Sequence, residues 1–128
     1  MHLQLIVAIA CGGAFGAVGR YFLTAQVAAW TGHGFPFGTL TVNVVGSFAM
    51  GVLVELGALV WSPPLELRAF LTVGFLGAFT TFSTFSMETV LLYERGDLLL
   101  CAAYVVGSVL LSVGAFFGAI YLLRAALT

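Results

Sequence analysis

Four long apolar runs make up most of this 128-residue chain and limit the folds it can adopt. A bilayer core about 30 Å thick is crossed by roughly 20 apolar residues in a helix. Only 7% of the residues are charged and the mean hydropathy is +1.16, whereas soluble domains carry about 25% charged residues. The sequence therefore predicts an all-α membrane protein in which residues 1–128 form a single four-helix transmembrane domain. The helices are expected at about residues 3–23, 39–61, 67–92 and 98–123.

The arginines are divided equally between the two sides of the predicted membrane domain. With four spans, Arg68 and Arg124 lie on the side of both termini, and Arg20 and Arg95 lie on the other side. Cytoplasmic loops normally carry an excess of basic residues, so this chain shows no preferred orientation. Either four charges are too few for the rule to apply, or the chain inserts in both orientations. In the second case, an inverted copy would complete an antiparallel, dual-topology homodimer with its twofold axis in the membrane plane.

The third apolar run contains a segment that is unusual for a lipid-embedded helix, Gly77 to Glu88, with five hydroxyl side chains and three phenylalanines. Glycine weakens a helix, and serine and threonine hydroxyls compete for its backbone groups. We therefore expect a break over Gly77–Thr81, near the bilayer midplane. Non-helical backbone at that depth must be buried in protein or line a cavity, and its freed carbonyls can bind a cation. The simpler interpretation of Phe82 and Phe85 is aromatic packing between helices.

Two further groups of polar residues lie inside predicted spans. Asn43 lies in the second span and offers two donors and an acceptor, either for a bond between helices or for a ligand. Tyr104, Ser108 and Ser112 are spaced by four residues, so they share one face of the fourth helix. Such a stripe is either a tight helix contact or a polar track through the membrane.

Three motifs follow one another along the chain. They are Gly16-Ala-Val-Gly-Arg20-Tyr21, Gly38-Thr-Leu-Thr-Val-Asn43-Val-Val-Gly46 and Gly77-Ala-Phe-Thr-Thr-Phe-Ser-Thr-Phe-Ser-Met-Glu88. Together with the chain length and the number of spans, they closely resemble the Fluc (CrcB-type) fluoride channels of bacteria. The resemblance implies an antiparallel homodimer with two pores in the bacterial inner membrane, through which cytoplasmic fluoride leaves passively, so that its toxicity is lowered.

The same resemblance assigns roles to residues of this sequence. It implies a structural sodium ion, not transported, that the backbone carbonyls of Gly77 and Thr80 from both subunits hold at the twofold axis; hard oxygen ligands suit such a cation. Phenyl ring edges are electropositive, and an arginine raises the local anion concentration, so both fit a fluoride pathway. The implied pathway residues are Arg20, Thr39, Asn43, Phe82, Ser83, Thr84, Phe85, Tyr104, Ser108 and Ser112.

A different class of membrane protein has to be weighed against this one. Glu55 and Glu88 are intramembrane carboxylates, which often mark functional sites, and small dual-topology proteins include proton-coupled multidrug exporters. Such exporters place their key glutamate in the first helix, where this chain has only Arg20. A purely structural subunit would need neither Asn43 nor the hydroxyl-rich break. We expect no enzyme, no nucleic-acid partner and no protein partner other than a second copy.

Overall fold

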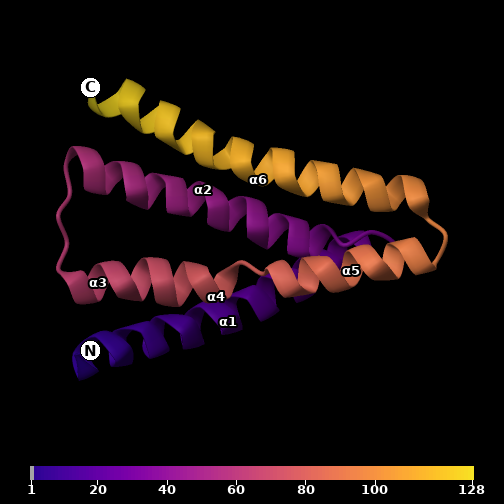
Figure 1. Ribbon diagram of the computed structural model, residues 1–128, viewed down its shortest axis with the longest axis horizontal. Helices are drawn as coiled ribbons and strands as arrows, with labels where there is room; N and C mark the ends of the chain where they lie inside the picture. The colour runs from indigo at the N-terminus through magenta and orange to yellow at the C-terminus, as the bar shows by residue number, and fades with distance from the viewer. Residues whose placement is uncertain (1) are drawn as a thin grey trace.

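The computed structural model describes residues 2–128, and the regular secondary structure in this range is helical. It contains four helical segments long and apolar enough to cross a membrane (Figure 1). The prediction of an all-α membrane protein with a broken third span is therefore confirmed. The elements are α1 (Leu3–Thr31), α2 (Phe37–Leu59), a composite third span of α3 (Leu65–Ala69), η1 (Phe70–Leu76), α4 (Gly77–Phe79) and α5 (Phe82–Glu94), and finally α6 (Leu98–Leu127).

The chain ends lie at the same end of the helical bundle, together with the connection between α2 and α3 (Figure 1). The α1–α2 and α5–α6 connections lie at the opposite end. Within residues 2–128, Arg124 pairs with Glu55 at the first end and Arg95 with Asp97 at the second, with 2.8 Å between nitrogen and oxygen in both. The termini and connections thus alternate between the two ends of the bundle, as expected of four successive spans.

The first helix is longer than predicted. The sequence suggested a loop from Thr24 to Gly38, but α1 continues to Thr31. The segment Thr24–Trp30 contains alanine and glutamine and neither glycine nor proline, so nothing in it stops a helix. The helix ends where Gly32 adopts a positive φ of 82°, a conformation that favours glycine. The other three spans differ from the predicted bounds by two to four residues at one or both ends.

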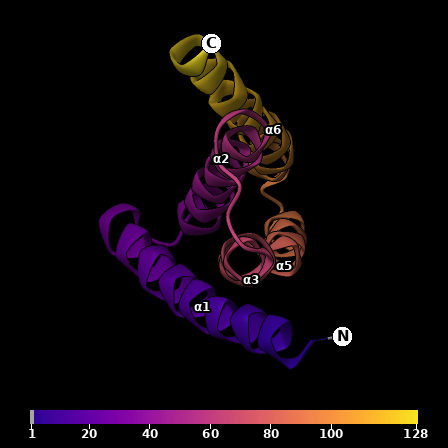
Figure 2. The same cartoon turned by 90° about the vertical axis from the view of Figure 1, so that its left-hand side faces the viewer.

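The helices pack in two closely spaced pairs, α1 with η1 and α2 with α6 (Figure 2). A Cβ atom on Gly74 would lie 2.6 Å from the carbonyl oxygen of Ile9, and one on Gly51 would lie 2.8 Å from that of Phe116. Any larger residue would force these backbones apart. These glycines therefore act as helix contacts within the chain, whereas a Cβ on Gly114 or Gly118 would have no neighbour within 4 Å.

The break in the third span is shorter than the sequence suggested. Residues Gly77 to Phe79 remain helical, and only Thr80 and Thr81 have extended backbone conformations, with ψ of 157° and 119°. The prediction that Gly77 itself leaves the helix is therefore wrong. Threonine ends the helix because its hydroxyl can cap the next one: Thr81 Oγ1 accepts from the Thr84 N–H at 3.2 Å. Upstream of the break, η1 is a π-helix, which the sequence analysis did not anticipate.

Candidate functional site

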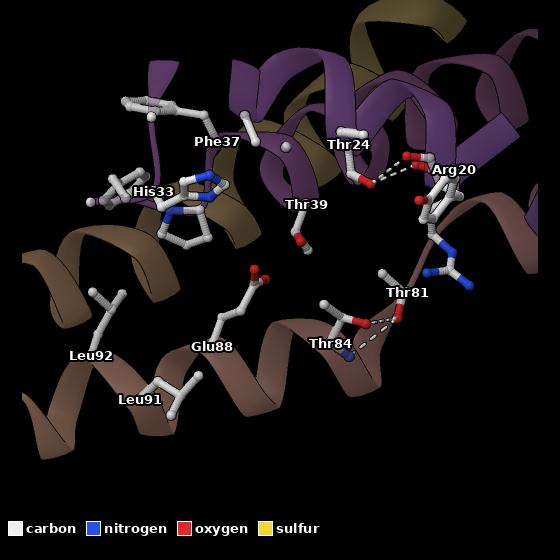
Figure 3. Close-up of a pocket in the computed structure, with 18 of the residues that line it drawn as sticks. Arg20, Thr24, His33, Phe37, Thr39, Thr81, Thr84, Glu88, Leu91 and Leu92 are labelled. Carbon is white, nitrogen blue, oxygen red and sulfur yellow. Dashed lines mark hydrogen bonds between the residues drawn. The ribbon is translucent and has the colours of Figure 1, made fainter. Parts of the chain in front are cut away.

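A cavity of about 440 Å³ opens at the end of the bundle that holds the α1–α2 and α5–α6 connections (Figure 3). We call it the mouth cavity. Helix α1 contributes Arg20 and Thr24, the loop before α2 contributes His33, and α5 contributes Thr84 and Glu88. Figure 3 shows Thr39 and Glu88 pointing toward one another across this space. The cavity thus combines hydroxyls, two arginines (Arg20 and Arg95), a histidine and a single carboxylate.

Glu88 is tied to the fourth span by a hydrogen bond. The hydroxyl of Tyr104 donates to Glu88 Oε1 at 3.0 Å, and Tyr104 is fully buried. Its ring packs between Phe35 and Phe85, with centroid distances of 5.5 and 5.1 Å. Tyr104 therefore holds this carboxylate of the mouth cavity from α6.

A second cavity, of about 330 Å³, lies beside the break in the third span and is called the middle cavity below. Its polar groups come from the break, α2 and α6, and the rings of Phe82 and Phe85 add its aromatic wall, with centroids 5.4 Å apart. In the part of the chain that is described, Ser108 Oγ is the one buried side-chain polar atom without a hydrogen-bond partner. The lining residues are Asn43, Ser47, Thr80, Thr81, Phe82, Phe85, Ser108, Val109, Ser112 and Val113.

Thr81 lines both cavities and is bound to α2. Its N–H donates to Asn43 Oδ1 at 2.7 Å, and Asn43 Nδ2 donates to the Thr81 carbonyl at 3.1 Å. In a continuous helix the Thr81 N–H would bond to the carbonyl of Gly77. The Asn43 amide therefore replaces the helical partner that the break removes.

Comparison with known proteins identifies the family. The family model described as "CrcB-like protein, Camphor Resistance (CrcB)" matches residues 7–120. The chain belongs to the CrcB family. Its relatives include a protein named fluoride-specific ion channel FluC from Rhodospirillum centenum, 55% identical over 97% of this chain and 98% of its own length. FluC proteins from Nitrobacter winogradskyi and Geobacter metallireducens are 48% and 53% identical, over 97% and 82% of this chain and 98% and 85% of their own lengths.

Within this CrcB chain, the predicted pathway residues fall into two groups. Arg20, Thr39 and Thr84 line the mouth cavity. Asn43, Phe82, Phe85, Ser108 and Ser112 line the middle cavity. Tyr104 lies between the groups, since its ring contacts Phe85 and its hydroxyl reaches Glu88. Ser83 lines neither cavity; it is exposed, and its hydroxyl lies 3.4 Å from Thr81 Oγ1.

The residues predicted to hold a cation meet its chemical demands in part. No group of three or more His, Cys, Asp or Glu side chains that could hold a metal occurs within residues 2–128, so a cation would depend on other oxygens. Gly77 is exposed at the break, and the donor that its carbonyl would have in a helix goes to Asn43 instead. Carbonyl oxygens are suitable ligands for a hard cation. The backbone carbonyls at Gly77 and Thr80 therefore suit a hard cation.

Sequence reasoning missed five residues of this CrcB site as individual contributors: Thr24, His33, Ser47, Thr81 and Arg95. Arg95 Nη2 donates to the carbonyl of Gly34 at 2.9 Å, which folds the α1–α2 loop over the mouth cavity. That loop was recognised only as a turn, because its residues carry no periodic pattern. Thr81 was assigned to the break without a specific partner. Its role follows from Asn43, which is 38 residues away and thus invisible to local spacing.

Proposed function

We propose that this chain is a fluoride channel. The single observation that carries the proposal is the middle cavity, where one amide, two phenyl rings and three serine hydroxyls converge from three separate helical segments. The buried Ser108 Oγ without a partner offers a free donor at this place. The relatives that carry the name fluoride-specific ion channel support the same ion.

The chemistry of the middle cavity suits weak binding of a small anion. Hydroxyl and amide N–H groups can replace part of the water around fluoride, and phenyl edges carry partial positive charge. The lining contains no Lys or Arg, which matters because conduction requires binding that is weak enough for the ion to leave. We assign Asn43, Phe82, Phe85, Ser108 and Ser112 to this part of the pathway.

The mouth cavity would collect the anion before it enters. Arg20 supplies positive potential there, which raises the local anion concentration, while the charge of Arg95 is largely offset by Asp97 at 2.8 Å. Thr39 and Thr84 provide hydroxyls beyond Arg20, and Tyr104 stands between the two cavities. Ser83 remains a proposed pathway residue only if a second subunit encloses it.

A second, inverted copy would complete the site. Phe82 is 78% exposed on the single chain, and the middle cavity beside it is lined by Asn43, Ser108 and Ser112. Polar groups at this depth are not left facing lipid. We infer an antiparallel homodimer with two equivalent pores, which the equal division of the arginines also favours.

A structural sodium ion at the dimer axis would be held by the Gly77 and Thr80 carbonyls of both subunits. When bound, the ion would supply positive charge between the two broken spans and would not itself be transported. The Thr81 N–H, bonded to Asn43, leaves the Gly77 carbonyl without its helical donor, and this supports the assignment. Exchange of external sodium for a bulky organic cation should slowly lower activity.

A passive fluoride channel has a clear use in the bacterial inner membrane. Hydrofluoric acid is neutral and crosses bilayers, and it dissociates inside the cell where the pH is higher. Fluoride would then leave through the channel down its own gradient, and toxicity would fall without an energy source.

The function can be tested in liposomes. The purified protein is reconstituted with fluoride or chloride inside, valinomycin sets the membrane potential, and selective electrodes record the anion released. Rapid fluoride loss without chloride loss supports the proposal, and Phe82→Ile should slow it strongly while the dimer stays intact. Release that occurs only against an opposing proton gradient would instead point to a proton-coupled exporter. The contacts of its two candidate carboxylates do not favour that alternative, because Glu55 pairs with Arg124 and Glu88 with Tyr104.

A further inference from the structure

Two side chains from different helices bind the backbone of the break from both sides. Arg20 Nε, on α1, donates to the carbonyl of Ala78 at 3.0 Å. Asn43, on α2, binds both the N–H and the carbonyl of Thr81. Each of these backbone groups would have found its partner inside the helix if the third span were continuous. Arg20 thus takes the place of a helical partner for the Ala78 carbonyl, and the Asn43 oxygen does so for the Thr81 N–H, while Asn43 Nδ2 adds a second bond to the Thr81 carbonyl.

Two N–H groups next to these contacts are satisfied locally. The Thr80 N–H donates to the carbonyl of Leu76 at 3.1 Å, and the Thr84 N–H donates to Thr81 Oγ1. Buried backbone groups are nearly always paired, so the two extended residues can persist in the membrane only while Arg20 and Asn43 stay bound. Without them, the lowest-cost response is to rejoin α4 and α5 as one helix.

The neighbouring glycines let the two helices come close enough for these bonds. A Cβ on Gly46, one turn after Asn43, would collide with the Thr80 side chain and would lie 3.3 Å from the Phe79 ring. Gly19, beside Arg20, lies against the same ring, since a Cβ added to it would be 3.7 Å from Phe79 Cδ1. Both motifs therefore combine a small residue that allows approach with a polar residue that binds backbone.

We propose that Arg20 and Asn43 are positioning residues that hold the third span in its broken form, in addition to the contact each makes with a cavity. Arg20 then acts through hydrogen-bond geometry as well as through charge. This inference rests on the proposed function and deepens it, because an unbroken span would withdraw the Gly77 and Thr80 carbonyls and turn Phe82 and Phe85 relative to Asn43.

The test separates the donor of Arg20 from its charge. Arg20→Gln keeps an N–H donor that can reach the Ala78 carbonyl but removes the charge, whereas Arg20→Met removes both. Amide hydrogen exchange is followed in the full-length protein, in detergent, on peptides that cover Thr80–Thr84 and on reference peptides from α6. We expect the amide exchange rate in the break to change at least tenfold in Arg20→Met and to stay within threefold of wild type in Arg20→Gln. The exchange rate in α6 should be unchanged in both variants.

Asn43 is tested by the same readout. Asn43→Asp keeps the acceptor for the Thr81 N–H but loses the donor to the Thr81 carbonyl, so an intermediate change is expected; Asn43→Leu removes both bonds and should give the full change. If Asn43→Leu does not fold, the exchange rate in the break is compared between Asn43→Asp and wild type. Equal exchange in wild type, Arg20→Met and Asn43→Asp would overturn the inference.

Flux measurements distinguish the failure of this inference from the failure of the proposed function. Wild-type fluoride release in liposomes decides the function and needs no variant. If Arg20 acted only through its positive charge, both Arg20 variants would show the same loss of fluoride flux and the same loss of its dependence on ionic strength. The amide exchange rate in the break would then be unchanged. Greater flux in Arg20→Gln than in Arg20→Met, together with the exchange difference, supports the positioning role.

Discussion

The Tyr104 hydroxyl lies 3.0 Å from Glu88 Oε1 and donates a hydrogen bond to it. This bond links the α5 half of the broken span to α6 at the boundary between the two cavities. It also explains how a carboxylate can stand beside a proposed anion pathway: one of its oxygens is directed to a buried donor. The sequence identified Glu88 only as an intramembrane carboxylate, and the structure adds its hydrogen bond to Tyr104.

Removal of this donor should weaken both the fold and the conduction. Tyr104→Phe keeps the ring contacts with Phe35 and Phe85 but removes the donor to Glu88, so the carboxylate in the mouth cavity would repel anions more strongly. A hydrogen bond to a charged group contributes about 1.5–3 kcal/mol, so we expect a lower melting temperature in detergent and slower fluoride release. Glu88→Gln, which keeps an acceptor, is the control. A Tyr104→Phe protein that melts and conducts like wild type would show that this bond has no role.

Ser108 allows stability and conduction to be separated. Its buried Oγ has no partner in the described chain, so Ser108→Ala removes an unsatisfied group and should leave the free energy of unfolding unchanged or slightly higher. If the hydroxyl serves the passing ion, flux should nonetheless fall, by up to about tenfold for a bond of about 1–1.4 kcal/mol. Thermal melting and liposome flux are measured on the same preparation. Loss of stability with unchanged flux would contradict both parts.

The contact between α1 and η1 predicts a strong effect of a small substitution. A Cβ on Gly16 would lie 2.9 Å from the carbonyl carbon of Phe75, and this backbone cannot turn aside as a flexible side chain would. Gly16→Ala should therefore destabilise the protein by about 1–3 kcal/mol, the usual range for overpacking. In contrast, Gly57→Ala on α2 meets nothing within 4 Å and should be neutral or stabilising. Similar melting temperatures for both variants would rule out the close contact.

The ion pair between α2 and α6 should respond unequally to loss of its two members. Glu55 is 6% exposed and Arg124 is 60% exposed by side chain. Arg124→Gln leaves a buried carboxylate without its cation, which we expect to cost about 1–3 kcal/mol, whereas Glu55→Gln leaves an arginine that water can reach. The double variant should recover part of the loss of the Arg124 variant. Denaturation of the four proteins checks this order, and a larger loss in Glu55→Gln would refute it.

Much of the fold could be predicted from hydrophobicity alone, because lipid requires whole helices of a fixed length. The four spans and the existence of a break follow from apolar runs and from the clustered hydroxyls after Gly77. Helix ends were less predictable, since α1 continues beyond the apolar region into Thr24–Thr31, where nothing stops a helix. The exact break depended on Thr81 as a helix cap and on Asn43 as its partner.

The candidate site was predictable in its residue types and less so in its arrangement. Spacing by four residues placed Tyr104, Ser108 and Ser112 on one face, but it could not show that Tyr104 faces Glu88 while Ser112 faces the middle cavity. Arg20 was predicted from the family resemblance of its motif, and its bond to the Ala78 carbonyl depends on residues 58 positions apart. Such pairings are set by how helices pack, which a single sequence does not encode in its local pattern.

The π-helix η1 gives the third span one residue more than a regular helix of the same length would have. In Phe70–Leu76 each bond spans five residues, so the stretch holds a residue that an α-helix of equal rise would omit. The wide turns take up this residue, so a deletion of one residue there would restore α-helical winding and leave Phe82 and Phe85 nearly in phase with Asn43. A deletion of one residue between Phe82 and Phe85, in the regular helix α5, would instead rotate Phe85 and the residues after it by about 100°. A change of length is therefore tolerated in η1 and disruptive in α5.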